Sequence, residues 1–160
     1  MTESSQNKTS GYERDGLDWY VEPRWCVDAL LDRLPDLRTV WDPACGAGTI
    51  PEACRARGIC AVGSDIADRG YGRPHVDFLQ GRDGCRAIPF GIPYAVITNP
   101  PYAKAAEFVR EARQVAARYV AVLVRLDFLA AQCRHAFFTE APPTRVLVLS
   151  QRPSMPPGQA

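Results

Sequence analysis

One segment, residues 119–126, restricts the possible fold more than any other part of the chain. Its sequence, YVAVLVRL, is nearly continuous in apolar residues and does not alternate between apolar and polar ones. A strand of this kind is typically buried on both faces, and such burial occurs mainly in parallel sheets that helices cover on both sides. The segment therefore predicts a strand within an α/β fold whose sheet is mainly parallel.

The rest of the chain supports this interpretation because strand-like and helix-like segments alternate. We expect further strands at residues 39–41, 60–65, 94–98 and 144–149, with residues 75–79 forming another strand or its end. We expect helices at residues 24–34, 49–57, 103–118 and 129–138. A length of 160 residues fits one domain. We expect that domain at residues 17–152, between a flexible polar tail at residues 1–16 and a proline-rich tail at residues 153–160.

Charge and cysteine usage argue against several classes of function. The formal net charge is +1, so a nucleic-acid substrate would need a local basic patch and not an overall basic field. No apolar run approaches the roughly 20 residues of a membrane span, and the polar amino terminus lacks the pattern of a secretory signal. The six cysteines form no Cys-x-x-Cys pair, which argues against a zinc site. We therefore expect a cytoplasmic protein with reduced thiols, no metal and no membrane partner.

A four-residue turn, Asn99-Pro100-Pro101-Tyr102, follows the predicted strand at residues 94–98. The two prolines fix the backbone and remove two N–H donors, which leaves carbonyl oxygens and the Asn99 side chain at the end of the strand. Tyr102 adds a flat ring beside these acceptors. The combination suits a planar amino group, whose N–H bonds the acceptors can bind while the ring stacks on its plane. The alternative is an ordinary loop, since Asn-Pro and Pro-Pro are common in turns.

A glycine turn follows the predicted strand at residues 39–41, with the sequence Asp42-Pro43-Ala44-Cys45-Gly46-Ala47-Gly48-Thr49. Gly46 and Gly48 permit a tight turn and a close approach to the backbone. Thr49 and Glu52 have the spacing of a capping box at the start of the next helix. Pro51 stands where a dinucleotide fingerprint has its third glycine, which disfavours a dinucleotide oxidoreductase. The turn by itself is a weak signal, and it can also be a simple turn.

Acidic and aromatic residues follow the next two predicted strands. Asp65 comes about twenty residues after the glycine turn, where it can accept hydrogen bonds from ribose hydroxyls or serve as a solvated helix cap. Asp77 and Phe78 follow, and taken alone they are a turn residue and a core residue. The glycine turn, Asp65 and Asn99 all fall at the carboxyl ends of predicted strands, where open α/β sheets bind ligands. The sequence thus predicts one crevice for a nucleoside-type ligand and an amine.

Two of these motifs resemble those of the class I S-adenosylmethionine-dependent methyltransferases, and in particular the N6-adenine DNA methyltransferases. The segment Asp42-Pro43-Ala44-Cys45-Gly46-Ala47-Gly48 is similar to the cofactor loop of that branch. The turn Asn99-Pro100-Pro101-Tyr102 matches its catalytic tetrapeptide. Arg125-Leu126-Asp127-Phe128 further resembles small phage or prophage members. The resemblance covers roughly residues 19–152 and implies a Rossmann-like fold with S-adenosyl-L-methionine as cofactor.

The resemblance also implies a role for each matching residue. Those that would bind the cofactor are the loop residues Asp42, Pro43, Ala44, Cys45, Gly46 and Gly48 at its methionine part, Asp65 at its ribose, and Ile66, Asp77 and Phe78 at its adenine. Those that would act on the target are Asn99 and the Pro100 carbonyl as acceptors, Pro101 as part of the rigid turn, and Tyr102 as a stacking ring. Glu22-Pro23 stands where the family often has a Thr-Pro pair near the methionine tail.

The function implied by the resemblance is methyl transfer to the N6 amino group of adenine in DNA. The alternatives are a methyltransferase acting on RNA or on a protein glutamine, and a non-catalytic subunit that keeps the fold. No segment is long enough for a separate target-recognition domain, so we expect loops, a partner or a second subunit to supply recognition. The carboxyl-terminal hairpin of the family's sheet is predicted to be incomplete, because only residues 144–149 resemble a strand there.

Overall fold

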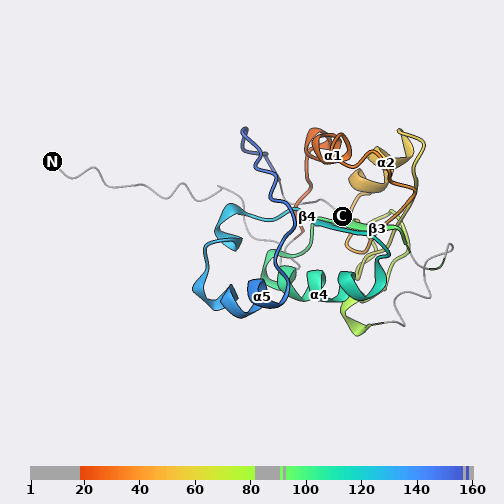
Figure 1. The fold of residues 1–160 in the computed structure, drawn as a ribbon. Coiled ribbons are helices and arrows are strands. Elements are labelled where there is room, and N and C mark those ends of the chain that lie inside the picture. The colour runs from red at the N-terminus through yellow and green to blue at the C-terminus, as the bar shows by residue number, and fades with distance from the viewer. Residues whose placement is uncertain (1–18, 82–90, 92, 157, 159–160) are drawn as a thin grey trace.

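The computed structural model describes residues 19–81, 91, 93–156 and 158. Its centre is a four-stranded sheet with the order β2-β1-β3-β4, in which all neighbouring strands are parallel (Figure 1). The strands are β1 (Thr39–Asp42), β2 (Cys60–Gly63), β3 (Ala95–Thr98) and β4 (Tyr119–Val122). The predicted α/β fold with a mainly parallel sheet is confirmed.

Helices cover both faces of the sheet. They are α1 (Arg24–Leu31), α2 (Thr49–Arg55), α4 (Ala105–Val115) and α5 (His135–Glu140), with short 3-10 turns at η1 (Phe78–Gln80), η2 (Tyr102–Lys104), η3 (Leu126–Phe128) and η4 (Gln132–Arg134). Figure 1 shows α1 and α2 on one side of the strands and α4 and α5 on the other. None of the helices in the described part of the chain is long and apolar enough to cross a membrane.

Successive residues of each central strand serve the two layers in turn. Val40 and Ile97 belong to the apolar cluster under α1 and α2, whereas Trp41 and Val96 belong to the cluster under α4. All four are at most 2% exposed. Full burial of such a side chain contributes about 1.5–3 kcal/mol. The central strands are therefore fixed between two apolar layers, and this fixes the position of the residues that follow them.

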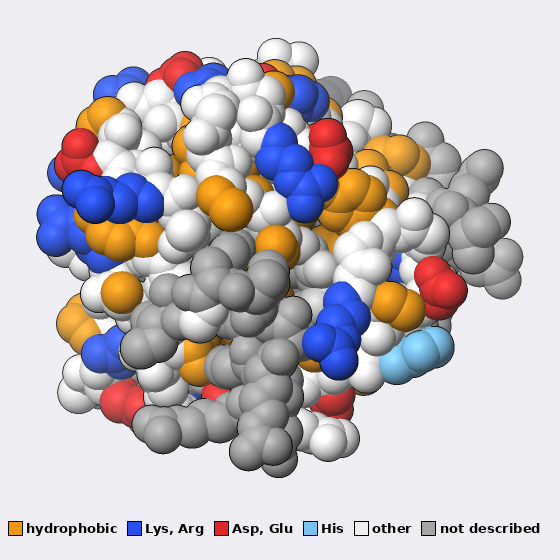
Figure 2. Space-filling view, turned by 90° about the vertical axis from the view of Figure 1, so that its right-hand side faces the viewer, with side chains coloured by type: hydrophobic (Ala, Val, Ile, Leu, Met, Phe, Trp, Pro, Cys, Tyr) orange, Lys and Arg blue, Asp and Glu red, His pale blue; other side chains and the backbone are white. Residues whose placement is uncertain are grey.

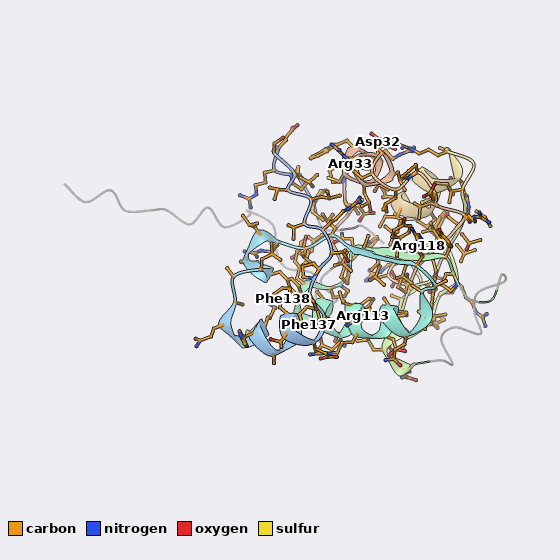
Figure 3. The ribbon with its side chains drawn as sticks, viewed as in Figure 1. Asp32, Arg33, Arg113, Arg118, Phe137 and Phe138 are labelled. Atoms are coloured by element: carbon orange, nitrogen blue, oxygen red, sulfur yellow. The ribbon has the colours of Figure 1, made fainter. Side chains whose placement is uncertain are left out.

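A third apolar cluster attaches α5 to α4. Phe137 packs edge-on against Phe128, and both are buried beside Ala105 at the start of α4. Figure 3 shows Phe137 and Phe138 on α5 beside α4. The helix predicted at residues 129–138 is corrected: the segment contains one short 3-10 turn, η4, and then the first residues of α5, which begins only at His135.

The length and the burial of β4 differ from the prediction. Residues 119–126 were expected to form a strand buried on both faces, but β4 ends at Val122 and its four residues are only half-buried. It pairs with β3 alone, so it is an edge strand of the described sheet. Burial of a strand depends on its neighbours as well as on its own residues, and an apolar run does not record which neighbours are present.

The strand predicted at residues 144–149 is not formed. Val146, Leu147 and Val148 are 51%, 48% and 71% exposed, and no strand of the described chain pairs with them. A β-prone sequence becomes a strand only when a neighbour accepts and donates its backbone hydrogen bonds. The expectation of an incomplete carboxyl-terminal hairpin agrees with this, since no hairpin is formed by the described residues.

Two local predictions are also corrected. Residues 75–79 form no strand: the side chain of Asp77 accepts the backbone N–H of Leu79 at 3.0 Å and begins η1. The capping box at Thr49 is absent, because Gly48 with a φ of 88° is the N-cap of α2 and no side chain caps it. Glu52 instead accepts hydrogen bonds from Arg55 and Tyr71. Residues 82–90, between η1 and β3, lie outside the described residues.

Candidate functional site

The carboxyl ends of three neighbouring strands meet at one edge of the sheet. β1 lies between β2 and β3, and all three run in the same direction. Asp42 ends β1, Asp65 lies just after β2, and Asn99 directly follows β3. The structure therefore brings together the glycine turn, Asp65 and the Asn99 turn, as the sequence predicts.

Asp65 holds the glycine turn in place. Its Oδ2 accepts the backbone N–H of Gly46 at 2.9 Å, and its Oδ1 accepts the backbone N–H of Ala67 at 3.0 Å. The side chain belongs to a residue only 7% exposed, so it is not a solvated helix cap. A carboxylate has about four acceptor sites, and two backbone bonds leave capacity for more. Its contact with ribose hydroxyls stays a prediction.

Aromatic rings cover the glycine turn. Gly46 and Gly48 have φ values of 50° and 88°, which favour glycine. A Cβ atom at Gly48 would lie 2.6 Å from the ring of Tyr71, and one at Gly46 would collide with the indole of Trp19. The guanidinium of Arg69 lies over that indole, 4.0 Å from the ring centroid. Other groups therefore do approach both glycines closely, as predicted. In this structure those groups are the side-chain rings of Trp19 and Tyr71.

Asp42 is a buried carboxyl at the end of β1. It is 1% exposed, and its Oδ1 accepts the backbone N–H of Ala44 at 3.2 Å. Burial, and next the neighbouring Glu22, raise the pKa of Asp42 well above its usual value. Burial and then Asp42 likewise raise the pKa of the Cys45 thiol, so Cys45 is a buried neutral group and not a reactive thiolate.

Glu22 joins the site from a distant part of the sequence. It precedes α1, is 8% exposed, and its Oε2 accepts a hydrogen bond from Asn99 Nδ2 at 3.0 Å. Burial raises the pKa of its carboxyl, although hydrogen bonds, including those from the Asn99 and Thr49 side chains, oppose the rise. The sequence marked Glu22 only as a departure from a Thr-Pro pair. No spacing or motif in the sequence indicates its contact with Asn99.

The Asn99 side chain is fixed at its nitrogen end. Its Nδ2 donates to the carbonyl oxygen of Tyr20 at 2.8 Å as well as to Glu22. In the same turn the backbone N–H of Lys104 donates to the Pro101 carbonyl at 2.9 Å, which starts η2. Asn99, Pro101 and Tyr102 are half-buried, whereas Pro100 is buried. The amide oxygen of Asn99 therefore faces away from Tyr20 and Glu22, in a rigid turn.

Tyr102 lies beside two other parts of the chain. Its ring is within 10° of parallel to that of Tyr20, with 6.2 Å between the centroids, and its hydroxyl donates to the Met155 sulfur at 3.5 Å. The backbone N–H of Val21 bonds to the carbonyl of Pro156 at 3.0 Å. The segment around Met155 thus runs along residues 19–21 at the edge of the site.

The three residues predicted at the adenine have different surroundings. Phe78 is 3% exposed and packs edge-on against Trp41, with ring centroids 5.1 Å apart, so it is a core residue. Asp77 caps η1 and Ile66 is 52% exposed just after Asp65. Contacts of these residues with an adenine ring stay predictions.

The buried ionisable groups of the site are all acidic, whereas the Arg69 guanidinium lies over Trp19, above the glycine turn. In the described part of the chain, the buried ionisable residues with charged side chains are Glu22, Asp42 and Asp65, and all three lie at this edge. The influences that shift the pKa values of Glu22 and Asp42 are burial, hydrogen bonds and other acids, with no lysine or arginine among them. Buried carboxylates without a cation are costly unless a ligand compensates them. The edge is therefore suited to a positively charged ligand.

The fold is similar to that of several methyltransferases. The chain matches a candidate RNA methyltransferase from Pyrococcus horikoshii with a TM-score of 0.54 and 16% identity, over 77% of this chain and 73% of that one. It also matches TrmN from Thermus thermophilus (TM-score 0.48, 18% identity, 76% of this chain and 41% of that one). A third match is a SAM-dependent methyltransferase from Archaeoglobus fulgidus (TM-score 0.42, 21% identity, 64% and 52%).

The likeness to the Pyrococcus protein concerns the fold. It shows that the parallel sheet with helices on both faces is a Rossmann-like fold, of the kind found in that protein. The chain spans 41% and 52% of the Thermus and Archaeoglobus proteins, about half their length. No family model matches the sequence, and no curated protein matches it significantly.

Proposed function

We propose that the chain is an S-adenosylmethionine-dependent methyltransferase that methylates the N6 amino group of adenine in DNA. The observation that carries the proposal is the fixed amide of Asn99, which lies at the same edge of the sheet as the glycine turn and its buried acids. An oriented acceptor beside a site for a cationic ligand is the arrangement that methyl transfer to an amine requires. The matching tetrapeptide Asn99-Pro100-Pro101-Tyr102 supports the same reaction.

The buried acids fit the proposed cofactor. S-adenosyl-L-methionine supplies, when bound, an electrophilic methyl group on a positively charged sulfur, and it carries an ammonium group as well. Asp42 and the glycine turn would hold its methionine part, with Asp65 at the ribose. The uncompensated burial of Asp42 and Glu22 supports this assignment, because a nearby positive charge would offset the cost of both carboxylates.

The Asn99 turn would act on the target amine. The lone pair of an exocyclic amine is delocalised into its ring, so the nitrogen is a poor nucleophile. The Asn99 amide oxygen and the Pro100 carbonyl would accept its two N–H bonds, favour a pyramidal nitrogen and disperse the positive charge that develops there. Tyr102 would stack on the base and hold it in line with the methyl group, and such positioning supplies much of the rate.

Recognition of DNA would depend on local contacts. The net charge is +1, and Figure 2 shows lysine and arginine side chains scattered among acidic and apolar ones on the face it presents. A target adenine in a duplex would have to be flipped out of the stack to reach Tyr102. We propose that a partner or second subunit contributes to the selection of the target.

The experiment that tests the proposal is transfer of labelled methyl from S-adenosylmethionine to unmethylated duplex DNA, with RNA and a protein extract in parallel. We expect N6-methyladenine in the DNA after digestion to nucleosides. Asn99→Ala should abolish transfer and keep cofactor binding. Label in RNA or in a protein glutamine would keep the chemistry and change the substrate. Cofactor binding without any transfer would favour a non-catalytic subunit that keeps the fold.

A further inference from the structure

We propose that Glu22 is a positioning residue, whose carboxylate fixes the orientation of the Asn99 amide so that the amide oxygen faces the target amine. The inference rests on the proposed function for its catalytic consequence. The geometric part, the control of Asn99 by Glu22, rests on the structure alone.

The orientation of the Asn99 amide follows from its neighbours. Nδ2 has two hydrogens, and they point to the Tyr20 carbonyl at 2.8 Å and to Glu22 Oε2 at 3.0 Å. Both partners are acceptors without a hydrogen to donate, provided that Glu22 is ionised. A flipped amide would place its oxygen against two other oxygens and lose both bonds. The nitrogen therefore faces Tyr20 and Glu22, and the oxygen is left for another donor.

Glu22 is the stronger of the two partners. A hydrogen bond to a carboxylate is roughly twice as strong as one between neutral groups, and Glu22 is 8% exposed, so water weakens it little. Pro23 follows at the start of α1 with a φ of -69°, which limits the movement of the backbone at this point. The backbone next to Glu22 is thus restricted, and the Glu22 carboxylate in turn restricts the orientation of the Asn99 side chain.

The charge of Glu22 also favours the reaction. A carboxylate that accepts from Nδ2 polarises the amide, and polarised groups in a hydrogen-bonded chain are better acceptors. The Asn99 oxygen becomes more negative at the position where the amine develops positive charge. Protonation of Glu22 would remove its negative charge, and with it both the polarisation of the Asn99 amide and the added negative charge on the amide oxygen.

Several ionisable groups face Glu22 and affect its titration. They are Asp42, whose pKa rises in part because of Glu22, and the thiols of Cys26 and Cys45, whose pKa values Glu22 also raises. Asp42 is therefore the other buried carboxyl whose raised pKa can contribute to the pH dependence. A test of Glu22 has to separate the two carboxyls.

The first arm of the test observes Asn99 directly. The chain contains two asparagines, Asn7 and Asn99, so 15N-asparagine labelling gives two side-chain amide signals in a proton–nitrogen NMR spectrum. We expect one pair to move as the pH passes through the pKa of Glu22. Glu22→Gln should stop that movement, whereas Asp42→Asn, which adds a third amide pair, and the exposed Glu107→Gln should retain it. An Asn99 signal that titrates unchanged in Glu22→Gln overturns the inference.

The second arm measures steady-state methyl transfer. Misplacement of a catalytic group costs up to about 100-fold in rate, so we expect Glu22→Ala to lower kcat about 10- to 100-fold with little change in KM for DNA. Glu22→Gln should recover part of kcat, because its oxygen can still accept from Asn99, and Glu107→Gln should match the wild type. The fall of kcat at acidic pH that Glu22 causes should be absent in Glu22→Gln.

The outcomes separate the inference from the proposed function. Wild-type transfer with an unchanged kcat in Glu22→Ala overturns the inference alone. A kcat that is unchanged at saturating cofactor, together with a weaker cofactor Kd, would assign Glu22 to cofactor binding and overturn positioning. A wild type that transfers nothing overturns the proposed function and the catalytic consequence, while the NMR arm still decides whether Glu22 orients Asn99.

Discussion

The carboxylate of Asp65 accepts the backbone N–H of Gly46 at 2.9 Å, and this bond ties the glycine turn after β1 to the end of β2. Its second oxygen accepts the N–H of Ala67. One buried side chain thus satisfies two backbone donors on separate segments. The turn that would hold the cofactor is shaped by the protein before any ligand arrives.

The first prediction concerns the stability that this bond provides. Asp65→Ala leaves two backbone N–H groups without their acceptor, at about 1–3 kcal/mol each, so we expect the free energy of unfolding to fall by about 2–6 kcal/mol. Chemical denaturation measures it. The control is Asp68→Ala, an exposed aspartate in the same loop that accepts from Gly70, which should change stability by less than about 1 kcal/mol. Equal losses in the two variants would contradict the role of Asp65.

The second prediction concerns the pH dependence of stability. The pKa values of Asp42 and Glu22 are raised in the folded state, so the folded protein binds protons more tightly than the unfolded chain. Stability contributed by these two groups should therefore fall as the pH rises from their usual values of 3.8 and 4.5 through the raised ones.

Asp42→Asn tests this prediction because asparagine does not titrate. We expect the fall of stability with pH to become shallower in this variant, as measured by denaturation at a series of pH values. Asp32→Asn is the control, since Asp32 directly follows α1 and pairs at the surface with Arg57. Figure 3 labels Asp32. A slope that Asp42→Asn leaves unchanged would show that the buried carboxyl is not the source.

The third prediction concerns the glycine turn. Gly48 and Gly58 both have positive φ values, 88° and 75°, so alanine at either costs about 1–2 kcal/mol of backbone strain. Only at Gly48 would the new Cβ also meet the Tyr71 ring, at 2.6 Å, whereas the space at Gly58 is open. We expect Gly48→Ala to weaken cofactor binding strongly in calorimetry and Gly58→Ala to leave it unchanged. Loss of binding in both variants would point to general destabilisation.

The four strands of the sheet could be predicted because apolar patterns and turn residues record local preferences. The sequence places Asp42, Asp65 and Asn99 at carboxyl ends of strands, and parallel pairing brings such ends together. The same reasoning fails at residues 144–149. Their β-branched residues favour a strand, but a strand also needs a hydrogen-bonding neighbour, which lies beyond local sequence.

Glu22 could not be predicted in its role for a related reason. It is 77 residues from Asn99, and no spacing or motif links the two. Their contact arises because the segment before α1 crosses the end of β3, a tertiary arrangement that local patterns do not encode. Trp19 reaches Gly46 in the same way. The positions of the motif residues could thus be predicted from the sequence, whereas their contacts with Glu22 and Trp19 could not.

The last prediction concerns Tyr102, in which the contribution of the ring can be distinguished from that of the hydroxyl by mutation. The ring would stack on the target base, and stacking of a base on an aromatic ring contributes about 1–3 kcal/mol. The hydroxyl instead donates to the Met155 sulfur at 3.5 Å. We expect Tyr102→Ala to raise KM for DNA about 5- to 150-fold, the range that corresponds to that energy, and Tyr102→Phe to remain close to the wild type. Met155→Ala is the matched control, because it removes the same hydroxyl contact and keeps the ring. If Tyr102→Phe and Met155→Ala lose as much as Tyr102→Ala, the hydroxyl contact with Met155 positions the turn, and stacking is not the main contribution of Tyr102.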